Sequence, residues 1–402
     1  MRFLTAGESH GQALLAIVEG LPAGLTIDFD GLTRELRRRQ GGYGRGRRMA
    51  IESDEARIVS GVRNGLTTGA PVGLMIRNRD WENWQRTMHV EGEVPAGAGG
   101  PDRAAVSRPR PGHADLAGAL KYGHDDIRDV LERASARETA ARVACGSLGR
   151  QLLERFGIEV TSHVISIGDV AIETPLAVSF EQARSLDPAA PLRCADADVE
   201  SRMTQAIDRA REAGDTVGGS FEVMARGLPP GLGSYAQWDR KLDGRLAQAL
   251  MSIPAIKAVG IGQGPRAASL PGSRMHDEIL PRPNAPANAV PLGRPTNNAG
   301  GLEGGVTNGE ELRVTVYMKP LSTLMKPLRS VDLTTMAEAP AAVERSDVCA
   351  VPAAAVVGEA MVCFVLADAF LEKFGADTIA DIERTYSDWR AKLAGRFPTA
   401  AR

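Results

Sequence analysis

Aromatic residues and an excess of charge of either sign are both scarce in this chain of 402 residues. Phe, Trp and Tyr make up only 4% of it, and 48 Lys and Arg against 50 Asp and Glu leave a formal net charge of -2. Nucleic-acid binding normally needs a basic surface and aromatic platforms on which bases stack. The composition therefore argues against a nucleic-acid-binding protein.

Cysteines are few and far apart. The chain contains 4 of them, with no Cys-x-x-Cys pair and no grouping with histidine of the zinc type. We therefore expect free thiols in a reducing compartment and no metal site.

Long hydrophobic runs free of charge are also lacking. Glu8 and His10 lie where a signal peptide would need an apolar stretch, and Leu14–Val18 is too short for one. The most apolar long stretch is Val351–Phe370, which includes a proline and two acids (Pro352, Glu359, Asp368). A buried core helix fits that stretch better than a membrane span, so we expect a cytoplasmic protein.

Apolar residues at helical spacing predict four long helices, separated by strand-like runs. The helices cover 135–157, 199–214, 242–253 and the segment after Pro352, and the strands cover 221–224 and 312–318. Ser135 and Glu138 have the spacing of a capping box, and Asn308-Gly309 is typical of a hairpin turn. Strands and helices do not strictly alternate, so the fold class is α+β. With no internal repeat and no long linker, we expect a single catalytic domain over 1–402, with 96–105 as an irregular loop.

The segment 37–48, RRRQGGYGRGRR, contains six arginines and no acid. A solvated helix end explains Arg37–Arg39, but it does not explain Arg45, Arg47 and Arg48 on a glycine-rich loop, where like charges repel. Guanidinium groups suit bidentate binding of carboxylate or phosphate, so an anion site is one interpretation. An RNA-binding or nuclear-localisation patch is the other functional interpretation.

Two histidines lie in glycine-flanked turns, His10 in GESHG and His113 in RPGHAD. A lone histidine is more often structural, but such turns let the backbone approach a ligand closely, and histidine serves as acid or base near neutral pH. Asp347 follows Arg345-Ser346 and is either a surface ion pair or a functional carboxylate. The segments 297–305 and 319–323 combine glycines, hydroxyls and a lysine, and together could hold a phosphate.

These segments, in this order, resemble the chorismate synthase family. The chain carries nine such segments: TAGESHG (5–11), RRRQGGYGRGRRM (37–49), RPGHADL (110–116), RASARETAARVA (133–144), GDTVGG (214–219), GLGSYAQWDRKLDGRLAQALMSI (231–253), NNAGGLEGG (297–305), MKPLSTL (318–324) and ERSD (344–347). The resemblance implies a β–α–β sandwich with a central layer of long helices, assembled as a homotetramer. It also implies a lyase that eliminates phosphate from 5-enolpyruvylshikimate 3-phosphate to give chorismate, the final step of the shikimate pathway of aromatic amino-acid biosynthesis. The implied cofactor is reduced FMN, with NADPH as the flavin reductant in some members.

The resemblance also assigns roles to particular residues. The anion site would be lined by four arginines (Arg39, Arg45, Arg48, Arg137), of which Arg39 and Arg45 are also candidates for NADP binding. His10 would protonate the departing phosphate, His113 would supply a proton to the flavin, and Asp347 would help the flavin take up the C6 hydrogen. The implied FMN contacts are Arg133, Ala134, Ser135, Pro254, Ala255, Gly304, Lys319, Pro320, Leu321, Ser322, Thr323 and Arg345.

One position departs from the family pattern. The chain has Pro254 where the family usually has Asn, and proline offers neither an amide side chain nor a backbone N–H. The FMN contact at this position is therefore the weakest of the set. A non-catalytic flavin- or anion-binding homologue remains the alternative to an enzyme, and phosphate release from the substrate would separate the two.

Overall fold

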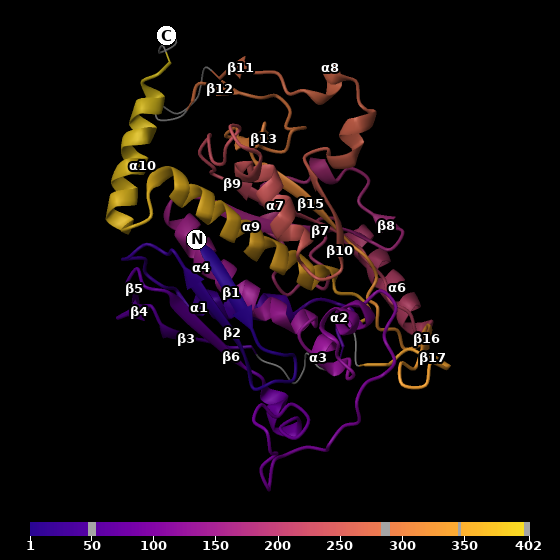
Figure 1. Ribbon diagram of the computed structural model, residues 1–402. Coiled ribbons are helices and arrows are strands. Elements are labelled where there is room, and N and C mark those ends of the chain that lie inside the picture. The colour runs from indigo at the N-terminus through magenta and orange to yellow at the C-terminus, as the bar shows by residue number, and fades with distance from the viewer. Residues whose placement is uncertain (47–53, 283–289, 345–346, 398–402) are drawn as a thin grey trace.

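The computed structural model describes residues 1–46, 54–282, 290–344 and 347–397 (Figure 1). Its first sheet has the order β1-β2-β6-β3, formed by Arg2–Ala6, Ala13–Glu19, Val72–Arg77 and Ala56–Ser60. All of its strand pairs are antiparallel. Along β2, Leu14, Ala16 and Val18 are buried while Leu15 and Ile17 are exposed, which is the alternation of a sheet with one covered face.

The second sheet has the order β10-β15-β9-β7-β8, again with antiparallel pairs. Its strands are Ile256–Ile261, Leu312–Met318, Gly219–Arg226, Glu159–Ile167 and Val170–Ala171. Leu312, Val314 and Val316 are fully buried, as the alternation in the sequence predicts.

A layer of helices separates the two sheets (Figure 1). It contains α1 (Phe29–Gln40), α4 (Thr139–Arg155), α7 (Leu242–Met251) and α9 (Val351–Phe374). Helix α4 contacts β2 and β6 of the first sheet, and α9 contacts β7 and β9 of the second. The α+β fold and the β–α–β sandwich predicted from the sequence are thus confirmed.

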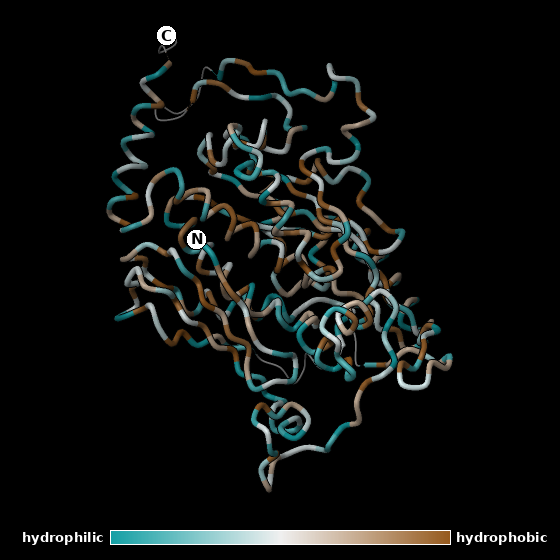
Figure 2. Tube along the Cα trace, viewed as in Figure 1, coloured by the Kyte–Doolittle hydropathy of each residue, from teal (hydrophilic) through white to brown (hydrophobic). Residues whose placement is uncertain are grey.

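Helices α4 and α9 pack closely along their length. Gly146 of α4 has no side chain where a Cβ would overlap Ala360 of α9, so glycine is what permits this approach. Helix α9 is long and apolar enough to cross a membrane, but 89% of its most apolar window is buried inside the protein. Its tube is largely brown in Figure 2, whereas the outer helix α10 (Ile379–Ala394) alternates with teal. The prediction of a buried core helix after Pro352 is confirmed.

A buried charge cluster ties this layer together. The Glu359 side chain on α9 accepts hydrogen bonds from Arg38 of α1 at 2.7 and 2.8 Å, from Arg150 of α4 at 2.5 Å and from Ser162 of β7 at 2.5 Å. Burial acts to raise the pKa of Glu359, but the guanidinium groups of Arg38 and Arg150 overcome this and hold the pKa well below its usual range. Arg38 therefore belongs to the core and not to a solvated basic face.

Two local predictions are wrong. Ser135 and Glu138 do not form a capping box: the Ser135 hydroxyl accepts the N–H of Arg137, a short 3₁₀ turn (Ala136–Glu138) follows, and α4 begins at Thr139. The Glu138 side chain is instead bound by Thr5 and Arg142, because tertiary partners compete with the local cap.

The hairpin turn was also misplaced. Asn308-Gly309 joins β14 (Val306–Thr307) to β15, which pair with other strands, whereas Gly304-Gly305 makes the hairpin between β13 (Leu302–Glu303) and β14. Both of those glycines have positive φ, as such a turn requires. The remaining predicted helices are found as α6 (Ala197–Glu212) and α7, and Gly157 follows the end of α4 with φ of 76°.

Candidate active site

The His10 turn follows β1 and rests on the end of the short helix α3 (Arg128–Leu131). The Glu132 carboxylate accepts the backbone N–H of His10 at 2.8 Å and lies 2.8 Å from Nδ1 of its ring. The Trp84 ring stacks on the imidazole with centroids 3.8 Å apart and planes 17° apart. Two contacts thus fix the imidazole of His10, and a third fixes its backbone.

The His113 turn precedes α2 (Asp115–Tyr122) and holds a second carboxylate. Nδ1 of His113 lies 2.5 Å from Asp115, whose other oxygen accepts Nε of Arg110 at 2.8 Å. Burial acts to raise the pKa of Asp115, but hydrogen bonds from His113 and Arg110 hold it below its usual range. Asp115 is therefore a charged partner that orients His113.

Arg39 and Arg137 lie on either side of the buried Asp54. Arg39 donates to Asp54 at 3.3 Å and to Thr139 at 2.9 Å, and Arg137 donates to the second Asp54 oxygen. Burial lowers the pKa of Arg39 to about 10; Asp54 opposes this shift, and the charges of Arg45 and Arg137 add to it. Two of the predicted anion-site arginines are thus held at fixed positions by a carboxylate that lies 15 residues beyond Arg39.

Asn78, after β6, connects this pair to the His10 turn. Its amide nitrogen donates to Gly11 at 2.6 Å and to Glu8 at 3.1 Å, and its oxygen accepts Nε of Arg137 at 3.1 Å. The His10 turn and the arginines therefore form one hydrogen-bonded unit.

Asp347 is paired with Arg45 at 2.8 Å and accepts the backbone N–H of Gly46 at 2.7 Å. The charges of Asp347 and Arg45 both act on Arg39, so the three belong to the same region. The segment 37–48 contains no acid, yet Arg38, Arg39 and Arg45 each meet a carboxylate from elsewhere in the chain. These carboxylates offset the like-charge repulsion predicted for the segment, although the charge of Arg45 still acts against that of Arg39. Arg47, Arg48 and Arg345 lie outside the described residues.

The predicted flavin contacts fall into separate groups. Lys319 donates through its backbone to Ala255 at 2.9 Å and through Nζ to Gly112 at 2.8 Å, next to His113. Arg110 donates to Thr323 at 2.9 Å, so 254–255, 319–323 and the His113 turn lie together. The segment 214–219 connects this group to Asp347. The Thr216 hydroxyl donates to the carbonyl of Leu321, and the backbone N–H of Val217 donates to the carbonyl of Val348, the residue after Asp347.

Three other members of the set lie elsewhere. Arg133 donates to Thr5 at 2.9 Å, and Ser135 contacts Ser9 at 3.2 Å, so both belong to the His10 side. Gly304 is exposed in the β13–β14 hairpin, where its near neighbour is Tyr235. Figure 1 shows β13 in the upper part of the molecule, away from α2 and α3 in the lower part. Within one chain Gly304 is not brought to the other predicted contacts.

Several residues of this site were missed by the sequence analysis, above all Glu132, Asp115, Asp54, Asn78 and Trp84. Glu132 immediately precedes the matched segment RASARETAARVA, and Asp115 lies within RPGHADL, so proximity to those segments was an available signal. Nothing in the local pattern around Asp54, Asn78 or Trp84 indicated a role. Among the described residues, no group of three metal-ligating side chains converges.

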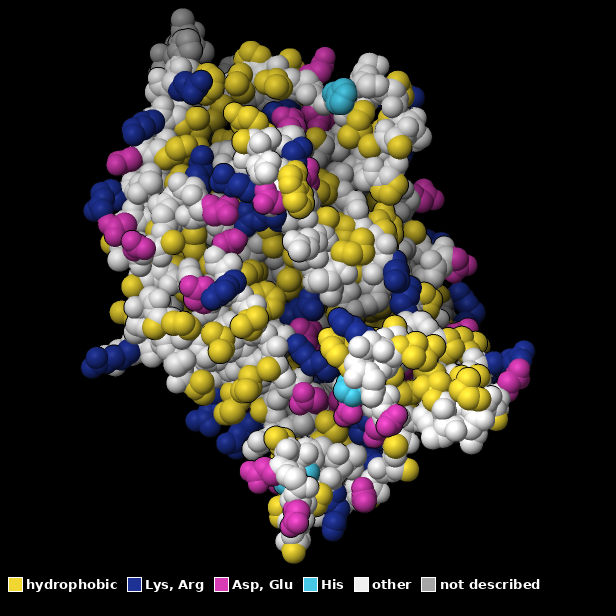
Figure 3. Space-filling view, viewed as in Figure 1, with side chains coloured by type: hydrophobic (Ala, Val, Ile, Leu, Met, Phe, Trp, Pro, Cys, Tyr) yellow, Lys and Arg dark blue, Asp and Glu magenta, His cyan; other side chains and the backbone are white. Residues whose placement is uncertain are grey.

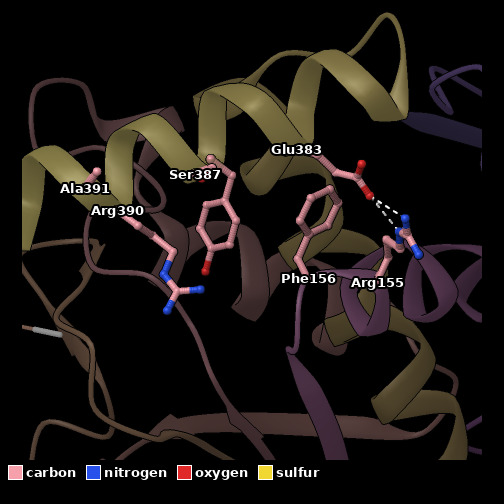
Figure 4. A pocket seen from close by; sticks show the side chains of 7 residues that line it. Arg155, Phe156, Glu383, Ser387, Arg390 and Ala391 are labelled. Atoms are coloured by element: carbon pink, nitrogen blue, oxygen red, sulfur yellow. Dashed lines mark hydrogen bonds and ion pairs between the residues drawn. The ribbon is translucent and has the colours of Figure 1, made fainter. Parts of the chain in front are cut away.

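A surface pocket of about 480 Å³ lies elsewhere, between the end of α4 and α10. Figure 4 shows Arg155, Phe156 and Glu383 at one end and Ser387, Arg390 and Ala391 at the other. None of these is a predicted site residue, and Arg155 is ion-paired with Glu383 at 2.6 Å. We attribute this pocket to the packing of α10.

The sandwich carries guanidinium groups, two oriented histidines and a carboxylate at its helix ends. These groups are typical of an enzyme that acts on a small, multiply anionic substrate. Comparison with known proteins identifies which one. The family model described as chorismate synthase matches residues 1–371, and the chain belongs to that family. It is a lyase that converts 5-enolpyruvylshikimate 3-phosphate to chorismate in the shikimate pathway, and its family uses reduced FMN.

Individual relatives agree with the family assignment. The chorismate synthase of Carboxydothermus hydrogenoformans is 54% identical over 393 residues, covering 98% of this chain and 99% of the relative. That of Moorella thermoacetica is 56% identical over 397 residues, covering 98% and 99%. A solved structure titled as the crystal structure of chorismate synthase aligns with a TM-score of 0.77 and 41% identity, covering 98% of both chains.

Proposed function

We propose that the two histidine turns and the arginine cluster carry out the elimination, with His10, His113 and Asp347 as the catalytic residues. The observation that supports this is the chain of hydrogen bonds that joins the turn of His10, through Asn78, to Arg137, and Arg137, through Asp54, to Arg39. Arg39, Arg45, Arg48 and Arg137 bind the phosphate and carboxylates of the substrate. His10 gives its Nε2 proton to the departing phosphate, and Asp347 assists removal of the C6 hydrogen.

The residues of the His113 side fit FMN. Burial, and then repulsion from Lys257, lowers the pKa of Lys319, so a bound phosphate would relieve the repulsion between two ammonium groups. Gly112, with φ of 79°, leaves open the space in which a Cβ would contact Lys319 and Ser322. The proposed contacts are those named from the sequence apart from Gly304, which lies away from the others within one chain. Pro254 would act through its ring and carbonyl alone. When bound, reduced FMN supplies the electron density that the elimination needs.

The decisive test is anaerobic turnover of 5-enolpyruvylshikimate 3-phosphate with chemically reduced FMN, read as chorismate absorbance and phosphate release. We expect turnover only with the reduced flavin. Equal turnover with oxidised flavin, or with none, would refute the proposed role of the cofactor. Absence of phosphate release in every condition would instead favour the non-catalytic homologue.

We further propose NADPH as a flavin reductant, with Arg39 and Arg45 as the candidate contacts. Guanidinium groups suit its phosphates. Anaerobic bleaching of bound FMN by NADPH supports the proposal, and an unchanged flavin spectrum opposes it.

We also propose that the chain acts as a single catalytic domain in a cytoplasmic homotetramer. One apolar core joins both sheets through α4 and α9. The outer face of the first sheet exposes Leu4, Leu15 and Ile17, with Leu4 directly opposite Ile17, and Figure 3 shows yellow side chains over this area. A second copy would cover such a face. Analytical ultracentrifugation should give four times the chain mass, with dissociation in Ile17→Asp; a wild-type monomer at micromolar concentration would refute it.

A further inference from the structure

Glu132 contacts His10 twice, and no other described side chain forms a hydrogen bond with this histidine. One carboxylate oxygen accepts the backbone N–H at 2.8 Å, and both oxygens lie within 2.9 Å of Nδ1. Trp84 stacks on the face of the imidazole. Together these contacts restrict both the backbone and the rotation of the ring.

The carboxylate itself is buried. The Glu132 side chain is 0% exposed, and its nearest cation is Arg128, one turn earlier, at 3.8 Å. Arg103 of the loop 96–105 lies 4.0 Å from the centre of the Trp84 ring. An ionised carboxylate only accepts hydrogen bonds, so Nδ1 of His10 must carry the proton. Nε2 is then the nitrogen that remains for a substrate.

A comparison within the molecule separates this arrangement from ordinary packing. His113 is bound to Asp115 through Nδ1, and the His10 and His113 side chains remain 14% and 18% exposed. His163, in the second sheet, is bound to Glu222 through Nε2 and is fully buried. His124, outside the site, also turns Nδ1 to a carboxylate, but at 3.5 Å and to an Asp129 side chain that is 62% exposed. A buried carboxylate close to Nδ1 of a partly exposed ring therefore occurs at the two histidines of the site, and the buried His163 is held the opposite way.

We propose that Glu132 is a positioning residue that keeps a proton on Nδ1 of His10 and directs Nε2 to the substrate. The inference rests on the proposed function, in which His10 is the acid. His10 enters this step as the imidazolium, with a proton on each ring nitrogen. As the carbon–oxygen bond breaks, its electron pair leaves with the phosphate, and the Nε2 proton of the imidazolium passes to a phosphate oxygen. The Nδ1 proton stays on the hydrogen bond to Glu132, so His10 becomes neutral without turning its ring.

The test compares Glu132→Gln and Glu132→Asp with the wild-type protein by two measurements. The first is the ¹⁵N spectrum of the imidazoles in ligand-free protein labelled at its 6 histidines, with His10→Ala to assign the signal. The second is kcat and KM with reduced FMN. In Glu132→Gln we expect His10 to lose its single Nδ1–H form and kcat to fall by roughly 10–100-fold, as when a carboxylate that orients a metal-bound histidine is removed. KM should stay within about threefold, and Glu132→Asp should recover part of kcat.

The matched control is Glu222→Gln, which removes a buried carboxylate from a histidine outside the site. It should lower thermal stability while leaving kcat and the His10 signal unchanged. An unaltered His10 signal in Glu132→Gln, or equal kcat in the Gln and Asp variants, would overturn the positioning role. If His10→Ala keeps full turnover while the His10 signal still depends on Glu132, the positioning stands and the acid role of His10 falls.

Discussion

At the scale of single residues, the site is built from charged side chains whose partners come from distant parts of the chain. His10 and Glu132 are 122 residues apart, and Arg110 and Thr323 are 213 residues apart. Such contacts explain why His10 and His113 occupy defined positions although each lies in a glycine-flanked turn. Because each histidine has its own carboxylate partner, the role of each can be tested by a separate substitution.

His10→Ala and His113→Ala should each lower kcat by at least roughly tenfold, because a positioned proton donor or acceptor typically contributes about 10²–10⁴-fold. Circular dichroism should remain that of the wild-type protein, since both side chains are partly exposed. Near wild-type turnover in both variants would return the two histidines to structural roles.

Arg45→Ala should raise KM for the substrate at least roughly tenfold, because it removes a guanidinium from the anion site and releases Asp347. FMN affinity, measured by fluorescence titration, should change less than about twofold, since the proposed flavin contacts lie elsewhere. Arg37→Ala is the matched control: Arg37 is exposed in the same segment, and the variant should behave as wild type. Equal effects of the two substitutions would show that only the overall charge of the segment matters.

At the scale of secondary-structure elements, the position of the arginine segment depends on the helix layer. Arg38 and Arg39 are neighbours on the last turn of α1, and one points to Glu359 in the core while the other points to Asp54 in the site. The cluster around Glu359 therefore positions α1, and with it the start of the segment 37–46.

Glu359→Gln should destabilise the protein by about 3–5 kcal/mol, the usual cost of removing one partner from a buried ion pair, because Arg38 and Arg150 lose their fully buried carboxylate and keep only Glu35. Chemical denaturation measures this. The control is Glu372→Gln, near the end of the same helix, where the carboxylate is 42% exposed and pairs with Arg245; that change should cost less than about 1 kcal/mol. Similar losses in both variants would contradict a special role for the buried cluster.

At the scale of the whole molecule, three buried carboxylates act in their ionised form. Glu222 and Glu359 bind residues of distant elements, and Asp115 binds Arg110 and His113 of its own turn. Asp115, Glu222 and Glu359 all have pKa values below their usual range; burial opposes these shifts, and hydrogen bonds and neighbouring cations outweigh it. The folded protein therefore binds fewer protons than the unfolded chain in mild acid.

The contribution of these three carboxylates to the free energy of unfolding should be constant above about pH 5. It should fall as the pH drops through about 4, because carboxyls of the unfolded chain take up protons there. Glu359→Gln should show a shallower fall over that range, measured by denaturant titration from about pH 6 to 3. A slope equal to that of the wild-type protein would show that the folded pKa of Glu359 is not lowered.

Much of the fold and the location of the chemistry followed from the sequence alone. The repeat of apolar residues placed α6, α7 and α9 and the strand β15, because periodicity reports which face of an element is buried. The glycine-flanked histidines, the arginine segment and their order along the chain pointed to the family. These patterns depend on residues that are close together in the chain, so they can be recognised without the tertiary structure.

Only the tertiary structure decided the partners. Glu138 binds Thr5 and Arg142 and does not form the predicted cap, and the hairpin lies at Gly304-Gly305. The arginines of the acid-free segment pair with Asp54, Asp347 and Glu359. Glu359 lies 321 residues from Arg38, and no sequence pattern measures a contact across that separation. A charged group is stabilised by whatever carboxylate or donor the fold brings within a few ångströms, and that proximity is a property of the packed molecule.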